Sequence, residues 1–89
     1  MKRIYQAGLT CGQNSWAVCG FGKSIEEARI ALEKAKHIDA LKFISDFSRK
    51  YPENAFDGKF LEKMYQDHLA LLNGHRYIET SFIDQGDPI

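Results

Sequence analysis

The chain has 89 residues and a mass of 10.2 kDa, which is enough for a single domain over residues 1–89. Its 12 basic side chains balance its 12 acidic ones, which disfavours both a strongly basic nucleic-acid binder and an acidic mimic of DNA. The hydrophobic fraction of 44% is that of a folded protein. No apolar run approaches the about 18 residues that a membrane helix needs, and we expect no secretory signal in the first residues.

Residues 3–10 and 15–21 predict two strands of a hairpin, because β-branched, aromatic and leucine side chains recur in both. The segment between them, Gly12-Gln13-Asn14-Ser15, has the composition of a turn.

The two cysteines are too few for a disulfide scaffold. The predicted hairpin also sets the distance between them. With the turn placed at residues 12–15, Cys11 lies opposite Trp16 and Cys19 lies about 10 Å further along the strand. A disulfide requires Cα atoms within about 7 Å. We therefore expect both thiols to be reduced and the protein to be cytoplasmic, whereas a longer irregular loop would bring the two cysteines together.

A long helix is predicted from Ile25 to about Lys50. Ser24 is placed to cap its first turn, and Glu27 to reach back in a capping box. Tyr51-Pro52 ends it, because the residue before a proline disfavours the helical conformation.

The apolar positions of this helix change sides near residues 37–39. One side carries Ile25, Ala28, Ala31, Leu32, Ala35 and Ile38, and another carries Ala40, Leu41, Phe43, Ile44, Phe47 and Tyr51. Either the helix breaks at this point, or one straight helix buries two different faces along its two halves.

A second amphipathic helix is predicted over residues 58–72, capped by Asn54 or Asp57. Asn73-Gly74 stops it, with Gly74 expected in the left-handed conformation. Residues 75–84 predict a third strand, and 85–89 a polar tail. The resulting class is α+β: a small antiparallel three-stranded sheet packed on one face by helices, in the order β-β-α(-α)-α-β.

The spacing of residues 17–24 resembles that of a phosphate-binding loop. Gly22, Lys23 and Ser24 are therefore a candidate anion site. Alanine replaces the first glycine of that pattern, and the preceding strand belongs to a hairpin rather than to a parallel sheet. The N-cap role of Ser24 explains the same residues.

The sequence contains little that indicates an enzyme, a metal site or a cofactor site. The spacing of Cys11, Cys19, His37, His68 and His75 does not match the close ligand pairs of structural zinc sites. No cysteine is tied to a histidine as a nucleophile would be. We therefore expect a protein that is not an enzyme and that binds no metal and no cofactor.

A chain of this size buries only about 60–65% of the surface that it exposes when unfolded. We therefore predict an intracellular protein-interaction module, acting as a homodimer or as a regulator or inhibitor docked on a larger protein. Its contact residues would be Trp16, Phe43, Phe47 and Tyr51. The alternative is that the chain bends near Asp39 and encloses these aromatic side chains in one core.

Nucleic-acid binding is the competing hypothesis. Residues 1–50 carry a net charge of +4 and residues 51–89 a net charge of −4. The basic side of the first part includes Lys42, Arg49 and Lys50. The aromatic side chains expected in the sheet, which would be available for stacking on bases, are Tyr5, Trp16, Phe21 and Tyr77.

Overall fold

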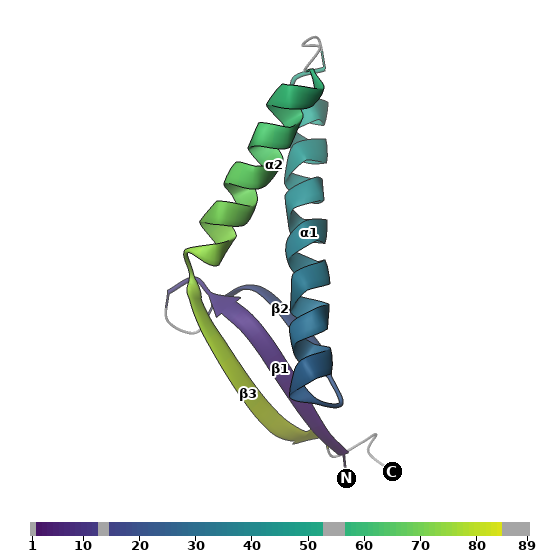
Figure 1. The fold of residues 1–89 in the computed structure, drawn as a ribbon, viewed down its shortest axis with the longest axis vertical. Helices are drawn as coiled ribbons and strands as arrows, with labels where there is room; N and C mark the ends of the chain where they lie inside the picture. Colours follow the sequence, from purple (N-terminus) through teal and green to yellow (C-terminus); the bar gives the residue numbers. More distant parts are fainter. Residues whose placement is uncertain (1, 13–14, 53–56, 85–89) are drawn as a thin grey trace.

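The computed structural model describes residues 2–12, 15–52 and 57–84. In chain order its elements are β1 (Lys2–Thr10), β2 (Trp16–Gly22), α1 (Ile25–Lys50), α2 (Gly58–Asn73) and β3 (Arg76–Asp84). They form an α+β fold with one antiparallel sheet and two helices, which confirms the fold class predicted from the sequence (Figure 1).

The sheet has the order β2-β1-β3, so that the first strand of the chain lies in the centre. One face of the sheet packs against α1, and we call it the inner face. The side chains of β1 that point to it are Tyr5, Ala7 and Leu9. The even-numbered positions of β1 point to the opposite, outer face, together with their cross-strand partners on β2 and β3.

The first half of α1 lies on the inner face, and two glycines of β2 allow a close approach. A Cβ on Gly20 would lie 2.3 Å from the backbone nitrogen of Leu32, and a Cβ on Gly22 would lie 2.7 Å from that of Ala28. The core formed there is small: Ala7, Ala28 and Leu32, with Tyr5, Val18 and Ile25 packed around them.

The second half of α1 extends beyond the sheet and packs against α2 instead (Figure 1). Of the two possibilities left open by the sequence, the straight helix is therefore the observed one. Its halves bury different faces because they contact different elements, namely the sheet and α2.

Both helix starts follow the local chemistry of their caps. The Ser24 hydroxyl accepts a hydrogen bond from the Glu27 N–H, and the Glu27 carboxylate accepts one from the Lys23 N–H at 2.7 Å. Asp57 caps α2 by accepting from the Phe60 N–H at 2.8 Å. The alternative cap Asn54, the turn residues 13–14 and the polar tail 85–89 lie outside the described residues.

Three local predictions are wrong. Gly74 ends α2 with φ −77°, in the right-handed region, because its N–H bonds back to the carbonyls of Ala70 and Leu71 in a tightened last turn. Ile38, expected on a buried stripe, is 66% exposed because it lies beyond the sheet and faces away from α2. An irregularity in the hairpin register between Leu9 and Thr10 places Thr10, rather than Cys11, opposite Trp16.

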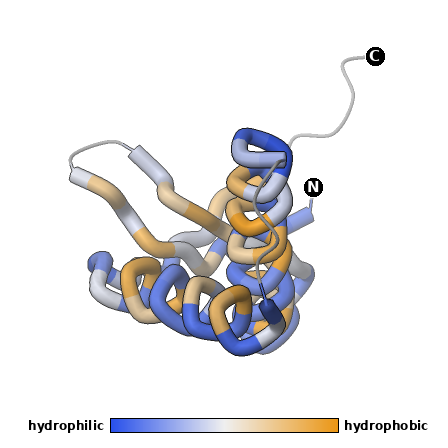
Figure 2. Tube along the Cα trace, turned by 90° about the horizontal axis from the view of Figure 1, so that it is seen from above, coloured by the Kyte–Doolittle hydropathy of each residue, from blue (hydrophilic) through white to orange (hydrophobic). Residues whose placement is uncertain are grey.

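The fold is elongated, with a radius of gyration of 16.3 Å and extents of 53 × 29 × 24 Å. A compact domain of this length has a radius of about 12 Å. Viewed along the long axis, the end of the β1–β2 hairpin projects away from the two helices and carries hydrophobic stretches, drawn in orange in Figure 2. The shape therefore leaves much apolar surface outside the small core.

Candidate interaction surfaces

The outer face of the sheet carries five large hydrophobic side chains from all three strands. We call this set the open face, and it consists of Ile4, Trp16, Phe21, Ile78 and Phe82. The three aromatic members are exposed: Trp16 by 40%, Phe21 by 52% and Phe82 by 43%. Both helices lie on the inner side or beyond the sheet, so that neither covers this face (Figure 1).

Two contacts organise the open face. The Trp16 ring lies directly on Gly8, where a Cβ would stand 2.4 Å from two of its ring atoms. Phe21 and Phe82 meet edge to face across the central strand, with ring centroids 6.4 Å apart. These aromatic side chains are thus held in place by the sheet, although water still reaches them.

One end of the open face is basic. A hollow of about 390 Å³ lies around Phe21 and Ile4, and is also lined by Lys2, Arg3 and Lys23. Glu27 is the acidic side chain in its lining, and its carboxylate is bound to the Lys23 N–H. The hollow therefore combines an aromatic ring with three cationic side chains.

The predicted contact residues on α1 lie at the far end of the molecule from the sheet. Phe43 stacks on the ring of His68 with centroids 4.7 Å apart, yet remains exposed. Phe47 is half-buried and contacts Tyr51, with centroids 5.0 Å apart. The aromatic side chains are thus not enclosed in one core, and Trp16 belongs to a separate surface, the open face.

The predicted basic surface on α1 is divided. Arg49 lies 3.9 Å from the Asp46 carboxylate, and the Lys50 ammonium lies 5.7 Å from the centre of the Tyr51 ring. Lys42 is exposed on the same side as Arg49, and lies about 80° around the helix from Lys50 at about 100° per residue. These cations therefore do not converge on one point.

At the candidate anion site, a carboxylate of the protein is already bound. Glu27 accepts a hydrogen bond from the Lys23 N–H, and Ser24 uses its hydroxyl as the N-cap. Gly22 packs against the first turn of α1. The Lys23 N–H and the Ser24 hydroxyl are thus engaged within the chain.

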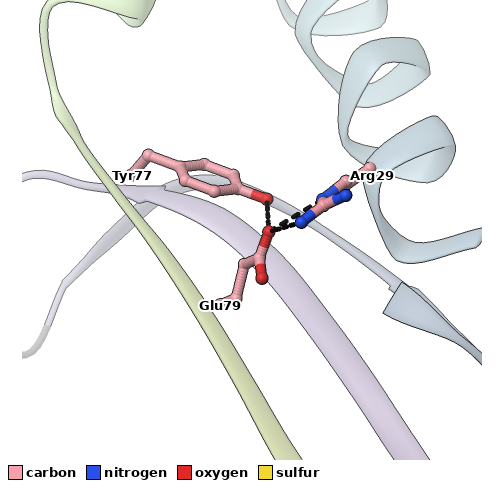
Figure 3. A network of polar contacts seen from close by, with 3 residues as sticks. All are labelled: Arg29, Tyr77 and Glu79. Atoms are coloured by element: carbon pink, nitrogen blue, oxygen red, sulfur yellow. Dashed lines mark hydrogen bonds and ion pairs between the residues drawn. The ribbon is translucent and has the colours of Figure 1, made fainter. Parts of the chain in front are cut away.

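The most connected polar network joins α1 to β3 (Figure 3). One Glu79 carboxylate oxygen accepts from Arg29 Nε at 2.8 Å and Tyr77 Oη at 2.6 Å, and lies 2.6 Å from Arg29 Nη2. These bonds hold the pKa of Glu79 below its ordinary value, with the Tyr77 hydroxyl as the first cause and Arg29 as the second. Partial desolvation, followed by the bond to Glu79, raises the pKa of Tyr77, and the bond to Glu79 raises that of Arg29.

A hollow of about 460 Å³ adjoins this network and is lined also by Ile30, Leu32 and Glu33. The charges of Arg29 and Glu79 pair with each other, so the network ties the edge strand β3 to α1. It explains why an edge strand tolerates a glutamate on its inner side.

His37 and His68 lie between the helices rather than at an open site. His68 Nε2 is 2.8 Å from Asp39 Oδ2, and the His37 ring is stacked on Tyr65 with a hydrogen bond to its hydroxyl. Within the described residues no group of three His, Cys, Asp or Glu side chains is arranged to hold a metal ion. Cys11 and Cys19 are both free thiols, the first exposed and the second half-buried.

Sequence reasoning did not find the open face as a unit. It grouped Tyr5, Trp16, Phe21 and Tyr77 as sheet aromatics, but the register places Tyr5 and Tyr77 on the inner face. Phe82, which completes the open face, was not singled out. The alternation of side chains along each strand carries this information once the strand order is known.

Comparison with known proteins adds no identification, since no family model, curated protein or solved structure matches this chain. Among the described residues, neither helix has the length and apolar character required to cross a membrane.

Proposed function

We propose that this chain is a protein-interaction module without catalytic function, and that it binds its partner through the open face. It acts as a homodimer or as a small regulator or inhibitor docked on a larger protein. The observation that carries the proposal is the cluster of Trp16, Phe21 and Phe82, three exposed aromatic side chains on one face of the sheet. Aromatic side chains are enriched in the energetically important centres of interfaces.

The exposed area supports the same conclusion. The chain has an accessible surface of 6757 Å². A compact monomer of this mass exposes about 5,300 Å². The elongated fold thus leaves more surface accessible than a compact monomer would, and part of it is the open face.

The rigid placement of the aromatic side chains also favours binding. Trp16 rests on Gly8, and Phe21 rests against Phe82, so these rings lose little conformational freedom when a partner covers them. The lost entropy of flexible side chains is one of the main costs of forming an interface.

The test compares two variants that remove exposed apolar surface from different parts of the molecule. The double variant Phe21→Ser/Phe82→Ser alters the open face, and Ile38→Ser alters an exposed position of α1 away from it. The wild-type protein is used as bait in a lysate of its host, and its self-association is followed by light scattering.

We expect wild type and Ile38→Ser to form the same complex, with another protein or with themselves, and the double variant to lose it. Circular dichroism establishes that each variant is folded. Two outcomes would refute the proposal: the folded wild type forms no complex, or the folded double variant forms the same complex as the wild type.

Nucleic-acid binding is the second candidate, and the basic hollow around Phe21 is the observation that favours it. A base stacked on the ring would place its phosphates near Lys2 and Lys23. In a gel shift at low salt, this function predicts binding to single-stranded RNA or DNA that weakens steeply with salt. Lys2→Glu/Lys23→Glu would abolish it, whereas reversal of Lys42, Arg49 and Lys50 tests the surface predicted from the sequence.

A further inference from the structure

Strand β3 forms an edge of the sheet along its full length. It pairs with β1 on one side, from Arg76 to Asp84, and within the described residues no strand pairs with its other side. Nine residues in unbroken register leave a row of backbone N–H and C=O groups available for another strand.

β3 lacks several of the features that protect edge strands: it contains no proline and no lysine, and its register with β1 shows no bulge. Its inward-pointing Glu79, a charge of the kind that can protect an edge, is paired with Arg29 of the same chain. The opposite edge strand, β2, is shorter, contains two glycines and has an irregular register near its start. Of the two edges, β3 is therefore the one suited to pairing.

β3 also exposes apolar side chains on both of its faces. Tyr77 is 45% and Ile83 48% exposed on the inner face, and Phe82 is exposed on the outer face. Because α1 lies over β1 and β2, it does not cover the inner face of β3 near Ile83. A strand added at the edge would cover part of each of these side chains.

The sequence of β3 is complementary to itself when two copies run antiparallel with Thr80 at the centre. This register sets Ile78 opposite Phe82 on the outer face, and Tyr77 opposite Ile83 on the inner face, each pair occurring twice. It also pairs position 76 with position 84, where the sequence has an arginine and an aspartate.

Neighbouring registers are less favourable. A centre at Glu79 would place two glutamates opposite each other, and a centre at Ser81 would place Glu79 opposite Ile83. The complementarity therefore selects one register, and with it a closed two-fold dimer instead of an open chain of subunits.

We propose that two copies of this chain join through their β3 strands, antiparallel and centred on Thr80, into a continuous six-stranded sheet. This inference goes beyond the proposed function, because it names a second copy as the partner of the β3 edge and leaves the open face free for the partner proposed above. The two open faces would then lie side by side, with Ile78 and Phe82 of both copies between the two Phe21 rings. The dimer thus doubles the apolar face instead of covering it.

Position 80 gives a sharp test, because at the two-fold axis it meets itself. Thr80 is exposed, and its hydroxyl donates only one long bond, 3.3 Å, to Gln6. Thr80→Lys and Thr80→Glu each place two like charges face to face, whereas a mixture of the two variants pairs opposite charges. Ser45→Lys and Ser45→Glu, at an exposed position of α1, are the matched controls for net charge.

The association is measured by sedimentation equilibrium. We expect the wild type and both Ser45 variants to form a dimer of about 20 kDa. Each Thr80 variant alone should have a dissociation constant raised about tenfold, and an equimolar mixture should return to the wild-type value or below.

Three results would overturn this inference: a wild type that stays monomeric, a dimer that neither Thr80 variant weakens, or a weakening that mixing does not reverse. None of these results decides the proposed function, because Phe21→Ser alone alters the open face on β2 and leaves the β3 edge unchanged. Loss of a complex in Phe21→Ser therefore tests the open face, and the Thr80 variants test the pairing of β3.

Discussion

Replacing Gly20 with alanine tests how closely α1 is held against the sheet. The added Cβ would lie 2.3 Å from the backbone nitrogen of Leu32 and 2.7 Å from the Cβ of Ala31. Ordinary contacts begin at 3.4 Å. Since the obstructing atoms belong mostly to the helix backbone, α1 has to move away from β2 by about 1 Å.

The magnitude follows from the opposing contributions. The methyl group gains at most about 0.8 kcal/mol from burial, and alanine lowers the entropy of the unfolded chain by about 0.4–1 kcal/mol. A gap of 0.5–1 Å forfeits about a quarter to a half of the dispersion energy at each affected contact. Overpacking costs about 1–3 kcal/mol in shifts of side chains and backbone, and an obstructing helix backbone places Gly20→Ala at the upper end of that range. The net loss of stability is then about 1–2 kcal/mol.

For a domain of this size, that loss lowers Tm by about 5–15 °C, measured by circular dichroism. Gly58→Ala is the matched control, because a Cβ there meets no atom within 4 Å and the residue lies in the first turn of α2. It should be neutral or stabilise by up to about 1 kcal/mol. If Gly20→Ala melts within a few degrees of the wild type, α1 does not lie against β2 as described.

Three further predictions concern separate parts of the molecule. Gly8→Ala displaces the Trp16 ring from the sheet and should shift its fluorescence emission to longer wavelength, whereas an unchanged spectrum would contradict the contact. Asp57→Ala removes the N-cap of α2 and should lower stability by about 1 kcal/mol in urea denaturation, with Asp57→Asn close to wild type. The lowered pKa of Glu79 means that its stabilising contribution is complete above the ordinary value of 4.5 and is lost as the pH falls through its folded value. The stability difference between wild type and Glu79→Gln should therefore shrink as the pH falls below 4.5, and a difference that stays constant would show that the carboxylate is not held by its partners.

Local chemistry accounts for the elements that the sequence predicted well. The caps at Ser24 and Asp57 and the proline at position 52 act on their immediate neighbours, so the bounds of both helices follow from a few residues each. Gly74 shows the limit of the same reasoning: a helix can also end in a tightened right-handed turn, and the residue type alone does not choose between the two.

The parts that could not be predicted depend on contacts between distant segments. The apolar side chains of α1 change from one side of the helix to another, which is compatible with a broken helix and with a straight one. Which of the two forms depends on where α2 packs. In the same way, the position of β1 between β2 and β3 requires a pairing across more than 65 residues of chain, which alternation within a strand does not encode. Without that order, Phe21 and Phe82 cannot be recognised as neighbours.

Strand β2 has small residues on its inner face and aromatic residues on its outer face, the reverse of what the packing of a helix on the sheet normally requires. A strand covered by a helix on one side normally directs its large side chains toward that helix. β2 does the reverse: its inner positions include Gly20 and Gly22, which α1 contacts directly, while Trp16 and Phe21 stand on the outer face. The close approach of α1 needs small residues inside, but it does not need aromatic residues outside, where polar side chains would serve a monomer equally well. The aromatic side chains of the outer face are therefore not required by the packing of α1, and the partner contact proposed above would account for their exposure and fixed placement.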